Sequence, residues 1–208
     1  MAKIGGGSNG SISGMIGPVV FFKLNGKLYA RKAPVRRAKN SWSNNQVLYR
    51  KKVSKLAAFW KLSIPVPTRQ VWNLATEAMT GYNLFLKTNL PAFSPDGMEI
   101  DPEWLHLSAG NLPLPHKLKA SRVAGDPGQV EVTWQDDSGI GLAQPTDVMM
   151  MVIAREGKFM VPVSTGAVRK QEKAVIQLPT GTGTAQGIYL SFAAKERMLY
   201  SPDQYFGL

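Results

Sequence analysis

The chain has no cysteine and only two histidines among its 208 residues. Without cysteine it cannot form a disulfide scaffold, a thiolate metal site or a cysteine nucleophile. His106 and His116 lie ten residues apart in a proline-rich stretch, where no helix can place both on one face. We therefore expect no metal site and no cofactor.

Catalytic motifs are also lacking. The glycine-rich start is not followed by the Gly-Lys-Ser/Thr of a phosphate-binding loop, and no Gly-x-Ser-x-Gly elbow occurs. Gly139-Ile140-Gly141 reads as a turn, and so does Asp136-Asp137, for which a cation contact is the less favoured alternative. No set of nucleophile, base and orienting residue emerges, so we expect a protein that is not an enzyme and has no small-molecule substrate.

Long apolar runs are missing near the start of the chain. Residues 4–22 are uncharged but rich in glycine and serine, which does not suit a membrane helix. Residues 1–10 have glycine where a signal peptide has its apolar region. We expect no membrane partner and a protein made in a cytoplasm without a signal peptide.

Acidic residues are nearly absent from the first 90 residues, which hold 15 Lys and Arg but one acid, Glu77. Their net charge is +14, whereas the remaining 118 residues, with 10 basic and 13 acidic side chains, carry −3. Such asymmetry indicates two structural units with different neighbours. A polyanion or an acidic protein surface would suit the basic half, and the alternative is that these cations only solubilise a helix face.

The basic half begins with a glycine- and serine-rich lead, residues 5–17, to which we assign no core-forming capacity. Residues 18–29 predict a β-hairpin, because two apolar runs flank Asn25-Gly26, a pair suited to a type I′ turn. Residues 31–39 form an extended basic arm, in which Pro34 disfavours helix.

Three helices should follow. The first is expected to run from a cap at Ser41 or Ser43 to about residue 62, where Pro65 and Pro67 stop it. The second is expected to begin at a Thr68 cap and to end at Gly81, and the third to cover residues 82–89. Residues 91–115 hold five prolines and predict a linker. Its acidic cluster, Asp96, Glu99, Asp101 and Glu103, lacks the glycine and terminal glutamate of an EF-hand and reads as a solvated loop.

In the rest of the chain, apolar and polar residues alternate with a period of two. Strands are expected at residues 117–123, 129–135, 147–155, 158–163, 173–178, 187–194 and 198–205. Strands and turns at this spacing predict an immunoglobulin- or fibronectin-like sandwich with Trp134 as its core aromatic residue. The expected fold class is α+β, with a basic assembly segment (residues 1–90), a linker (91–115) and a sandwich (116–208).

Several motifs resemble a family of uncharacterised proteins of Bacteroidota and their phages. They are Gly17-Pro18-Val19-Val20, Asn25-Gly26-Lys27, residues 31–34, Gln46 with Arg50, Arg69 with Trp72, residues 80–85 (TGYNLF) and residues 201–207 (SPDQYFG). The resemblance covers most of the chain. It implies short helices and a C-terminal Ig-like sandwich, and a component of a phage or phage-like particle.

These observations lead to the hypothesis of a structural virion protein, in a tail, connector or capsid-decoration role. It would assemble with itself and with other particle proteins through its basic half. The candidate contact surface consists of the cations Arg31, Lys32, Arg36, Arg37, Lys39, Arg50, Lys51, Lys52 and Lys55. One alternative is a sequence-independent DNA-binding protein that uses the same residues against phosphates. Another is a surface adhesin or carbohydrate-binding module built on the sandwich.

Overall fold

The computed structural model describes residues 3–4, 12–24, 27–35, 42–155, 158–179, 184–194, 196 and 198–208. The chain divides into two compact units, Met1–Ser43 and Asn44–Leu208. This boundary differs from the one expected at residue 90. The reason is that the helices after residue 44 share a hydrophobic core with the sandwich, and therefore belong to the second unit.

The first unit contains a four-stranded antiparallel sheet in the order β1-β2-β3-β4. The strands are β1 (Lys3–Ile4), β2 (Ile12–Ile16), β3 (Val19–Leu24) and β4 (Lys27–Lys32). Pairing of β3 with β4, with Phe22 opposite Tyr29, confirms the predicted hairpin. Its turn residues, Asn25 and Gly26, lie outside the described residues.

The lead before this hairpin, to which no core-forming capacity was assigned, contributes β1 and β2, and none of its side chains described at residues 13–17 is buried. Its side chains are small, yet pairing needs backbone N–H and C=O groups, and β3 offers a free edge to β2. Gly17, with a φ of +56°, makes the connection between β2 and β3. The glycine- and serine-rich composition of the lead therefore gave no indication of strands β1 and β2.

The second unit opens with three helices, as predicted: α1 (Asn44–Leu62), α2 (Val66–Leu74) and α3 (Gly81–Asn89). The ends of α2 differ from the prediction. Pro65 stands at its N-cap and Pro67 in its first turn, where the fixed φ of proline and its missing N–H are tolerated. Thr68 is therefore a buried residue inside α2 rather than its cap.

Gly81 also has a different role from the one expected. It begins α3 instead of ending α2, and the side chain of Thr80 caps α3 by accepting a hydrogen bond from the Asn83 amide at 3.2 Å. A Cβ atom at Gly81 would lie 2.6 Å from the backbone nitrogen of Asn73. Close packing of α2 against α3, not a left-handed helix end, explains this glycine.

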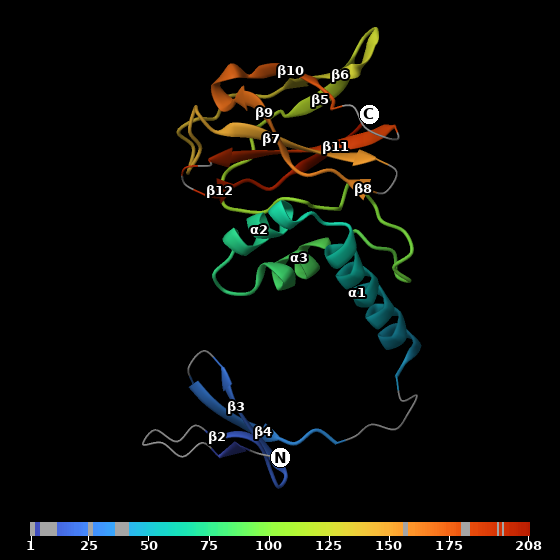
Figure 1. Cartoon of the computed structure of the whole chain (residues 1–208), viewed down its shortest axis with the longest axis vertical. Helices are drawn as coiled ribbons and strands as arrows, with labels where there is room; N and C mark the ends of the chain where they lie inside the picture. The colour runs from blue at the N-terminus through green and yellow to red at the C-terminus, as the bar shows by residue number, and fades with distance from the viewer. Residues whose placement is uncertain are drawn as a thin grey trace. The chain divides into compact units, whose positions relative to one another are not determined.

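Two antiparallel sheets form the sandwich (Figure 1). The smaller sheet has the order β10-β6-β5, and the larger has β12-β11-β7-β8, with β13 on β11 and β9 on β7. The strands are β5 (Lys119–Val123), β6 (Asp126–Thr133), β7 (Val148–Arg155), β8 (Lys158–Phe159), β9 (Val163–Val168), β10 (Lys173–Gln177), β11 (Ala185–Ala194), β12 (Leu199–Tyr200) and β13 (Gln204–Gly207). Strands that alternate between two sheets in this way are typical of an Ig-like sandwich, and the α+β fold class is confirmed.

Three details of the strands differ from the prediction. The strand expected at residues 158–163 is split into β8 and the start of β9, and most of β9 was missed. A short 3-10 helix, Arg169–Gln171, follows β9. The last expected strand is divided into β12 and β13 by Ser201, Pro202 and Asp203, and this interruption places Asp203 inside the protein.

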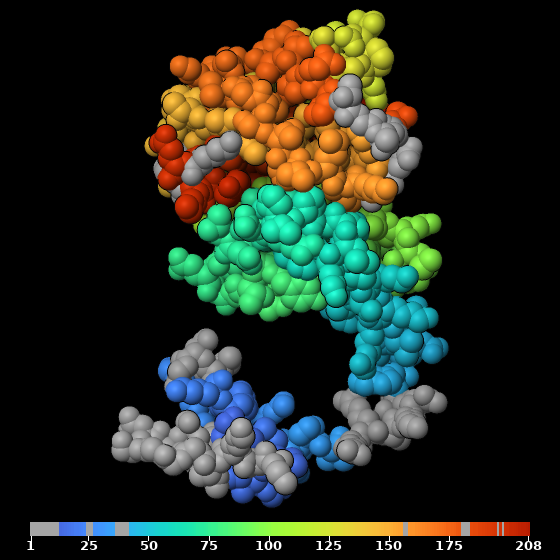
Figure 2. All heavy atoms as spheres, in the orientation of Figure 1, coloured from blue at the N-terminus to red at the C-terminus, as the bar shows by residue number. Residues whose placement is uncertain are grey.

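The helices cover the outer face of the larger sheet, so the second unit has three layers (Figures 1 and 2). One core lies between the sheets and includes Trp134, as predicted, together with Met149 and Phe192. The other lies between the helices and the sheet, where Trp72 and Phe85 share a cluster with Tyr189. Because β11 is covered on both faces, its sequence is nearly all apolar instead of alternating.

The expected linker is part of this second core. Its side chains in that core are Ala92, Phe93, Leu105 and Leu107, whereas Leu112 is buried in the core between the sheets. Prolines in residues 91–115 mark an irregular path across the protein rather than a free connection. The acidic cluster within it is exposed at all four carboxylates, as expected of a solvated loop.

Candidate functional site

The predicted basic surface falls on both compact units. Arg31 and Lys32 are exposed in β4, whereas Arg50, Lys51, Lys52 and Lys55 lie on α1. Arg36, Arg37 and Lys39 lie outside the described residues. Five of the nine cations therefore belong to the first unit and four to the second.

Three of the α1 cations, Lys51, Lys52 and Lys55, lie near the acidic loop. Gly97 packs against α1, where an added Cβ would lie 3.1 Å from the Cβ of Lys55. Hydrogen bonds from Ser94 and from the Met98 amide hold the pKa of Asp96 below its usual range, and Lys51 lowers it further. Part of the positive charge on α1 is thus balanced within the second unit.

The N-terminal sheet carries a different kind of basic surface. Phe22 stacks on Tyr29 with ring centroids 5.7 Å apart, and the Arg31 guanidinium lies 5.7 Å from the centroid of Phe22. Met15, opposite Val20 on the neighbouring strand, is 58% exposed. No side chain described in residues 13–23 and 27–35 is buried, so this sheet has strands without a core.

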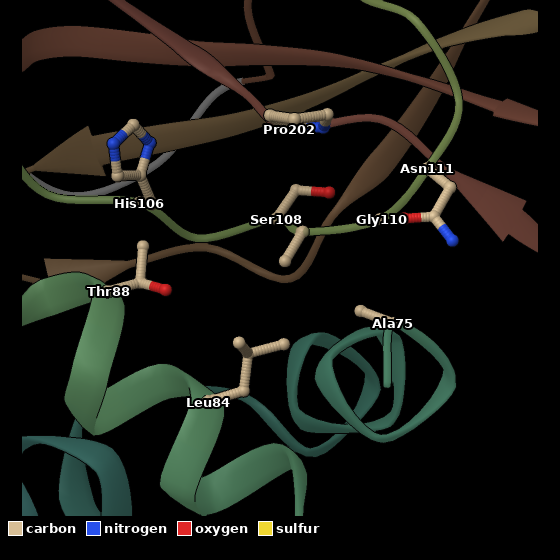
Figure 3. A pocket seen from close by; sticks show the side chains of 9 residues that line it. Ala75, Leu84, Thr88, His106, Ser108, Gly110, Asn111 and Pro202 are labelled. Carbon is tan, nitrogen blue, oxygen red and sulfur yellow. The ribbon is translucent and has the colours of Figure 1, made fainter. Parts of the chain in front are cut away.

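A second feature is a hollow of about 300 Å³ between α2, α3 and the segment before the sandwich (Figure 3). His106 and Ser108 line it together with Pro202. The Nδ1 atom of His106 lies 2.9 Å from Oδ1 of Asp203, and this hydrogen bond raises the pKa of His106. Complete burial raises the pKa of Asp203, an effect that the bond from His106 opposes.

This arrangement is not that of a catalytic triad. The Ser108 hydroxyl donates a hydrogen bond to the Ser201 carbonyl at 2.7 Å, so its proton is directed away from the histidine. The second oxygen of Asp203 accepts from the amides of Leu107 and Ser108 at 2.7 and 3.1 Å. The His106–Asp203 pair therefore joins two distant segments of the backbone.

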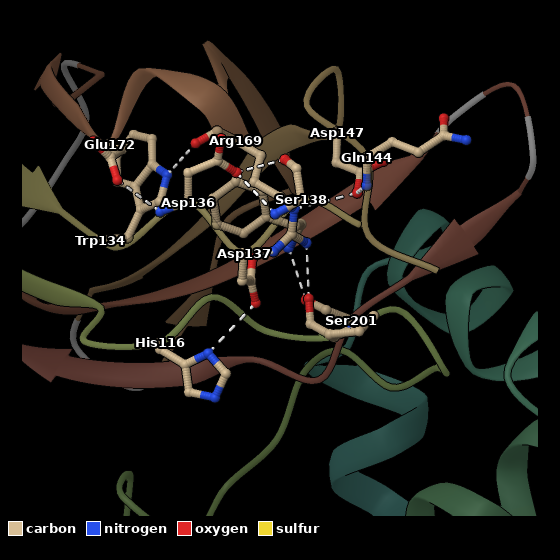
Figure 4. Close-up of polar contacts among 12 residues, drawn as sticks. His116, Trp134, Asp136, Asp137, Ser138, Gln144, Asp147, Arg169, Glu172 and Ser201 are labelled. Atoms are coloured by element: carbon tan, nitrogen blue, oxygen red, sulfur yellow. Dashed lines mark hydrogen bonds and ion pairs between the residues drawn. The ribbon is translucent and has the colours of Figure 1, made fainter. Parts of the chain in front are cut away.

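A fully buried arginine forms the third feature (Figure 4). Arg169 donates from Nη1 to Asp137 at 2.5 Å, from Nε to Asp147 at 3.2 Å and from Nη2 to the Pro113 carbonyl at 2.8 Å. Its guanidinium carbon lies 4.8 Å from the centroid of the Phe192 ring. A cation contact was the less favoured interpretation of the Asp136-Asp137 turn, but Asp137 does form an ion pair, with Arg169 of the chain itself.

Sequence reasoning missed both Asp203 and Arg169. Their partners lie 97 and 32 residues away, respectively, so no local spacing connects them. The available signals were weak: a carboxylate inside an apolar closing segment, and an arginine beside a short turn. Among the described residues, no group of three or more His, Asp or Glu side chains is placed to hold a metal, and no helix is long and apolar enough to span a membrane.

A fourth feature is an aromatic pocket of about 380 Å³ between the helices and the outer face of the larger sheet. Its aromatic lining comprises Phe59, Phe159, Tyr189 and Tyr205, whose neighbouring ring centroids are 5.0 to 6.0 Å apart. Pro102 of the acidic loop also lines it, and its carbonyl accepts a hydrogen bond from the Tyr189 hydroxyl at 3.0 Å.

The fold and these features define a mixed α+β protein with an Ig-like sandwich and a separate basic sheet. The chain belongs to a family of unknown function, DUF6266, whose model matches residues 11–207. No curated protein matches it. Among solved structures, it is similar to the crystal structure of the rat CD45 extracellular region, domains d3–d4, with 13% identity and a TM-score of 0.32. That match covers 48% of this chain and 51% of the CD45 chain, so this chain spans about half the length of its neighbour.

Proposed function

We propose that the chain is a non-enzymatic structural protein of a phage or phage-like particle, which assembles through its basic N-terminal sheet. The observation that carries this proposal is the contrast between the two units. The second unit has two buried hydrophobic cores, whereas the described side chains of the first unit are all at least partly exposed.

A sheet of this kind gains little from hydrophobic burial on its own. Small sheets require a covered apolar face for stability in water. Here Met15, Ile16, Leu28 and Tyr29 are exposed by 43 to 58%. Met15 and Tyr29 lie on one face of the sheet, and Ile16 and Leu28 on the other. Contact with a partner would cover the apolar side chains of one face and stabilise the sheet, which is the behaviour of an assembly element.

The charge of the first unit also supports an assembly role. The first 43 residues hold eight Lys and Arg and no acid. Copies of this segment repel one another, so its partner is an acidic surface rather than another basic sheet. The assignment to a particle rests on the motifs that resemble phage-associated proteins, and a location in the virion follows from that assignment.

The polar clusters of the second unit support a structural role rather than catalysis. Arg169 is fully buried with its hydrogen-bond donors directed at Asp137, Asp147 and a backbone carbonyl. Asp203 forms hydrogen bonds with His106 and with two backbone amides. In both clusters the groups are used to join segments of this chain.

Light scattering coupled to size-exclusion chromatography tests the proposal, with negative-stain microscopy of the same fractions. Nucleic-acid-free full-length protein should form oligomers, rings or tubes. A chain of residues 44–208, which retains both cores, should be folded and monomeric. If this shorter chain assembles as the full-length protein does, the assembly role of the N-terminal sheet is wrong.

A second candidate function is sequence-independent DNA binding. The observation in its favour is the cluster of exposed cations, with Arg31 and Lys32 in β4 and no acid in the same unit. A salt titration against duplex DNA separates the two functions. Binding through phosphates should weaken by about 0.9 in log affinity per log unit of salt for each contact.

A further inference from the structure

The aromatic pocket has a negatively charged rim. Asp101 and Glu103 are exposed on either side of Pro102, which lines the pocket. Burial raises the pKa of Tyr189 far above its usual range, and Asp203, Tyr205 and Asp101 add to this rise in that order. Burial also raises the pKa of Tyr205, to which Glu103 contributes. Both rim carboxylates therefore act on hydroxyls inside the pocket, whose tyrosines stay neutral.

Such a pocket selects its occupant in two ways. Its size is near the lower end of the range for ligand sites, about 300 to 1,000 Å³, which suits side chains better than a large cofactor. Its aromatic walls favour an apolar or aromatic group, and the faces of the rings also favour a cation. The carboxylates at the rim favour a positive charge beside that group.

One face of the N-terminal sheet presents this combination. Residues that alternate along β4 point to the same side, so Tyr29 shares a face with Lys27 and Arg31. Phe22 lies on the same face because it is paired with Tyr29 and lies beneath the Arg31 guanidinium. The face thus places the half-buried ring of Phe22 and the exposed ring of Tyr29 between two cations, with no acid in its unit.

We infer that the aromatic pocket with its acidic rim, at Asp101 and Glu103, receives the Phe22–Tyr29–Arg31 face of the N-terminal sheet of a second copy of this chain. This inference rests on the proposed assembly role and names its partner surface. Apolar character and charge match on the two sides: aromatic rings enter an aromatic pocket, and Lys27 and Arg31 meet the two carboxylates.

The contact has a consequence for the form of the assembly. Sheet and pocket are different surfaces, so each copy offers one of each and the interface is heterologous. Head-to-tail contacts of this kind close into rings or continue as filaments, depending on the rotation between neighbours. Reciprocal exchange of sheets between two copies would be the smallest closed form of this assembly.

Charge reversal with mixing tests the inference in the full-length protein. The sheet variant carries Lys27→Glu and Arg31→Glu, and the rim variant carries Asp101→Asn and Glu103→Lys. Asparagine at position 101 can still accept the hydrogen bond that Asp101 receives from the Glu103 amide. Each variant alone should need about tenfold more protein for half-maximal association, because like charges then face each other.

An equimolar mixture of the two variants should associate as the wild type does. In the mixture, the acidic sheet of one copy meets the basic rim of the other, and the native surfaces also remain available to each other. Sedimentation velocity at matched concentrations measures both results. Recovery on mixing requires contact between copies, so a sheet that folded back on its own chain would not produce it.

Matched control variants make the same changes in net charge at other positions. Lys23→Glu with Lys32→Glu reverses two cations on the opposite face of the sheet, and Glu77→Lys with Glu196→Gln alters two exposed acids away from the pocket. Both controls should associate as the wild type does. Circular dichroism should give the same spectrum for all variants.

The remaining outcomes separate the inference from the proposed function. If full-length protein associates and the 44–208 chain does not, but the reversals act no more strongly than their controls, the pocket inference is overturned while the assembly role stands. Failure of the mixture to recover association overturns the inference as well. A wild-type protein that stays monomeric at all concentrations overturns both the inference and self-assembly.

Discussion

The Nδ1 atom of His106 lies 2.9 Å from Oδ1 of Asp203, although 97 residues separate the two in the chain. The other oxygen of Asp203 accepts hydrogen bonds from the Leu107 and Ser108 amides. Asp203 stands between β12 and β13, the last strands of the sandwich. One carboxylate therefore fastens the closing strands to the segment that connects the helices to the sandwich.

The His106–Asp203 pair predicts a pH dependence of stability. The hydrogen bond to Asp203 raises the pKa of His106 above its unfolded value of about 6.5. A group with a raised pKa binds its proton more tightly in the folded state, so its stabilisation is complete below pH 6.5 and is lost as the pH rises through the folded pKa. The free energy by which wild type exceeds His106→Gln should therefore be larger at pH 5.5 than at pH 8.5.

Urea titrations at the two pH values measure this difference. His116→Gln is the control, because the His116 side chain is 68% exposed and its Nδ1 atom lies 3.7 Å from Asp137. The control should lower the free energy of unfolding less than His106→Gln does at pH 5.5, because its side chain is exposed. An advantage of wild type over His106→Gln that is equal at both pH values would show that protonation of His106 does not stabilise the fold.

Replacement of Asp203 itself should cost more than loss of His106. Asp203→Ala leaves the buried amides of Leu107 and Ser108 without their acceptor, and a loss of about 2 to 4 kcal/mol in the free energy of unfolding is expected. Asp96→Ala is the matched control, since Asp96 also accepts two hydrogen bonds but is exposed, and it should cost less than about 1 kcal/mol. Equal losses in the two variants would contradict the anchoring role of Asp203.

The sequence was a good guide to elements whose signals are local. The helices at 44–62 and 81–89 and the hairpin around residue 25 depend on caps, apolar spacing and turn residues that are neighbours in the chain. The alternation after residue 117 was sufficient to predict the sandwich and Trp134 in its core. These features repeat a physical pattern within a few residues.

Features that depend on tertiary contacts were predicted less well. Proline content made residues 91–115 look like a linker, although Phe93 and Leu105 are core residues of the helical layer. The aromatic pocket joins Phe59 of α1 to Tyr189 of β11, which no spacing relates. The basic surface was predicted from charge alone, and charge does not determine which compact unit carries a side chain.

The buried arginine provides a test of the sandwich. Arg169→Met removes the guanidinium but keeps an unbranched side chain, and leaves Asp137 and Asp147 buried without their cation. Removal of one partner from a buried ion pair costs about 3 to 5 kcal/mol. We expect a loss of that size in the free energy of unfolding, measured by chemical denaturation.

An exposed pair is the control for Arg169. Lys173 lies 2.6 Å from Glu131, with side chains 58% and 39% exposed. Lys173→Met should cost less than about 1 kcal/mol, because surface ion pairs contribute little. If Arg169→Met is tolerated as well as Lys173→Met, the network around Arg169 is not needed for the stability of the sandwich.

Close packing of α2 against α3 predicts the effect of one methyl group. A Cβ at Gly81 would lie 2.6 Å from the nitrogen of Asn73 and the carbonyl carbon of Trp72, and both are backbone atoms that cannot rotate away. Alanine favours helix by about 1 kcal/mol over glycine, but displacement of α2 should outweigh this gain and give a net loss of about 1 to 3 kcal/mol. Thermal and urea unfolding of Gly81→Ala measure the loss, with Lys87→Ala on the exposed face of α3 as a near-neutral control. Because Trp72 and Phe85 pack edge to face with centroids 5.1 Å apart, the near-ultraviolet circular dichroism of Gly81→Ala should also weaken. Stability equal to or above that of wild type would show that the two helices can separate without loss.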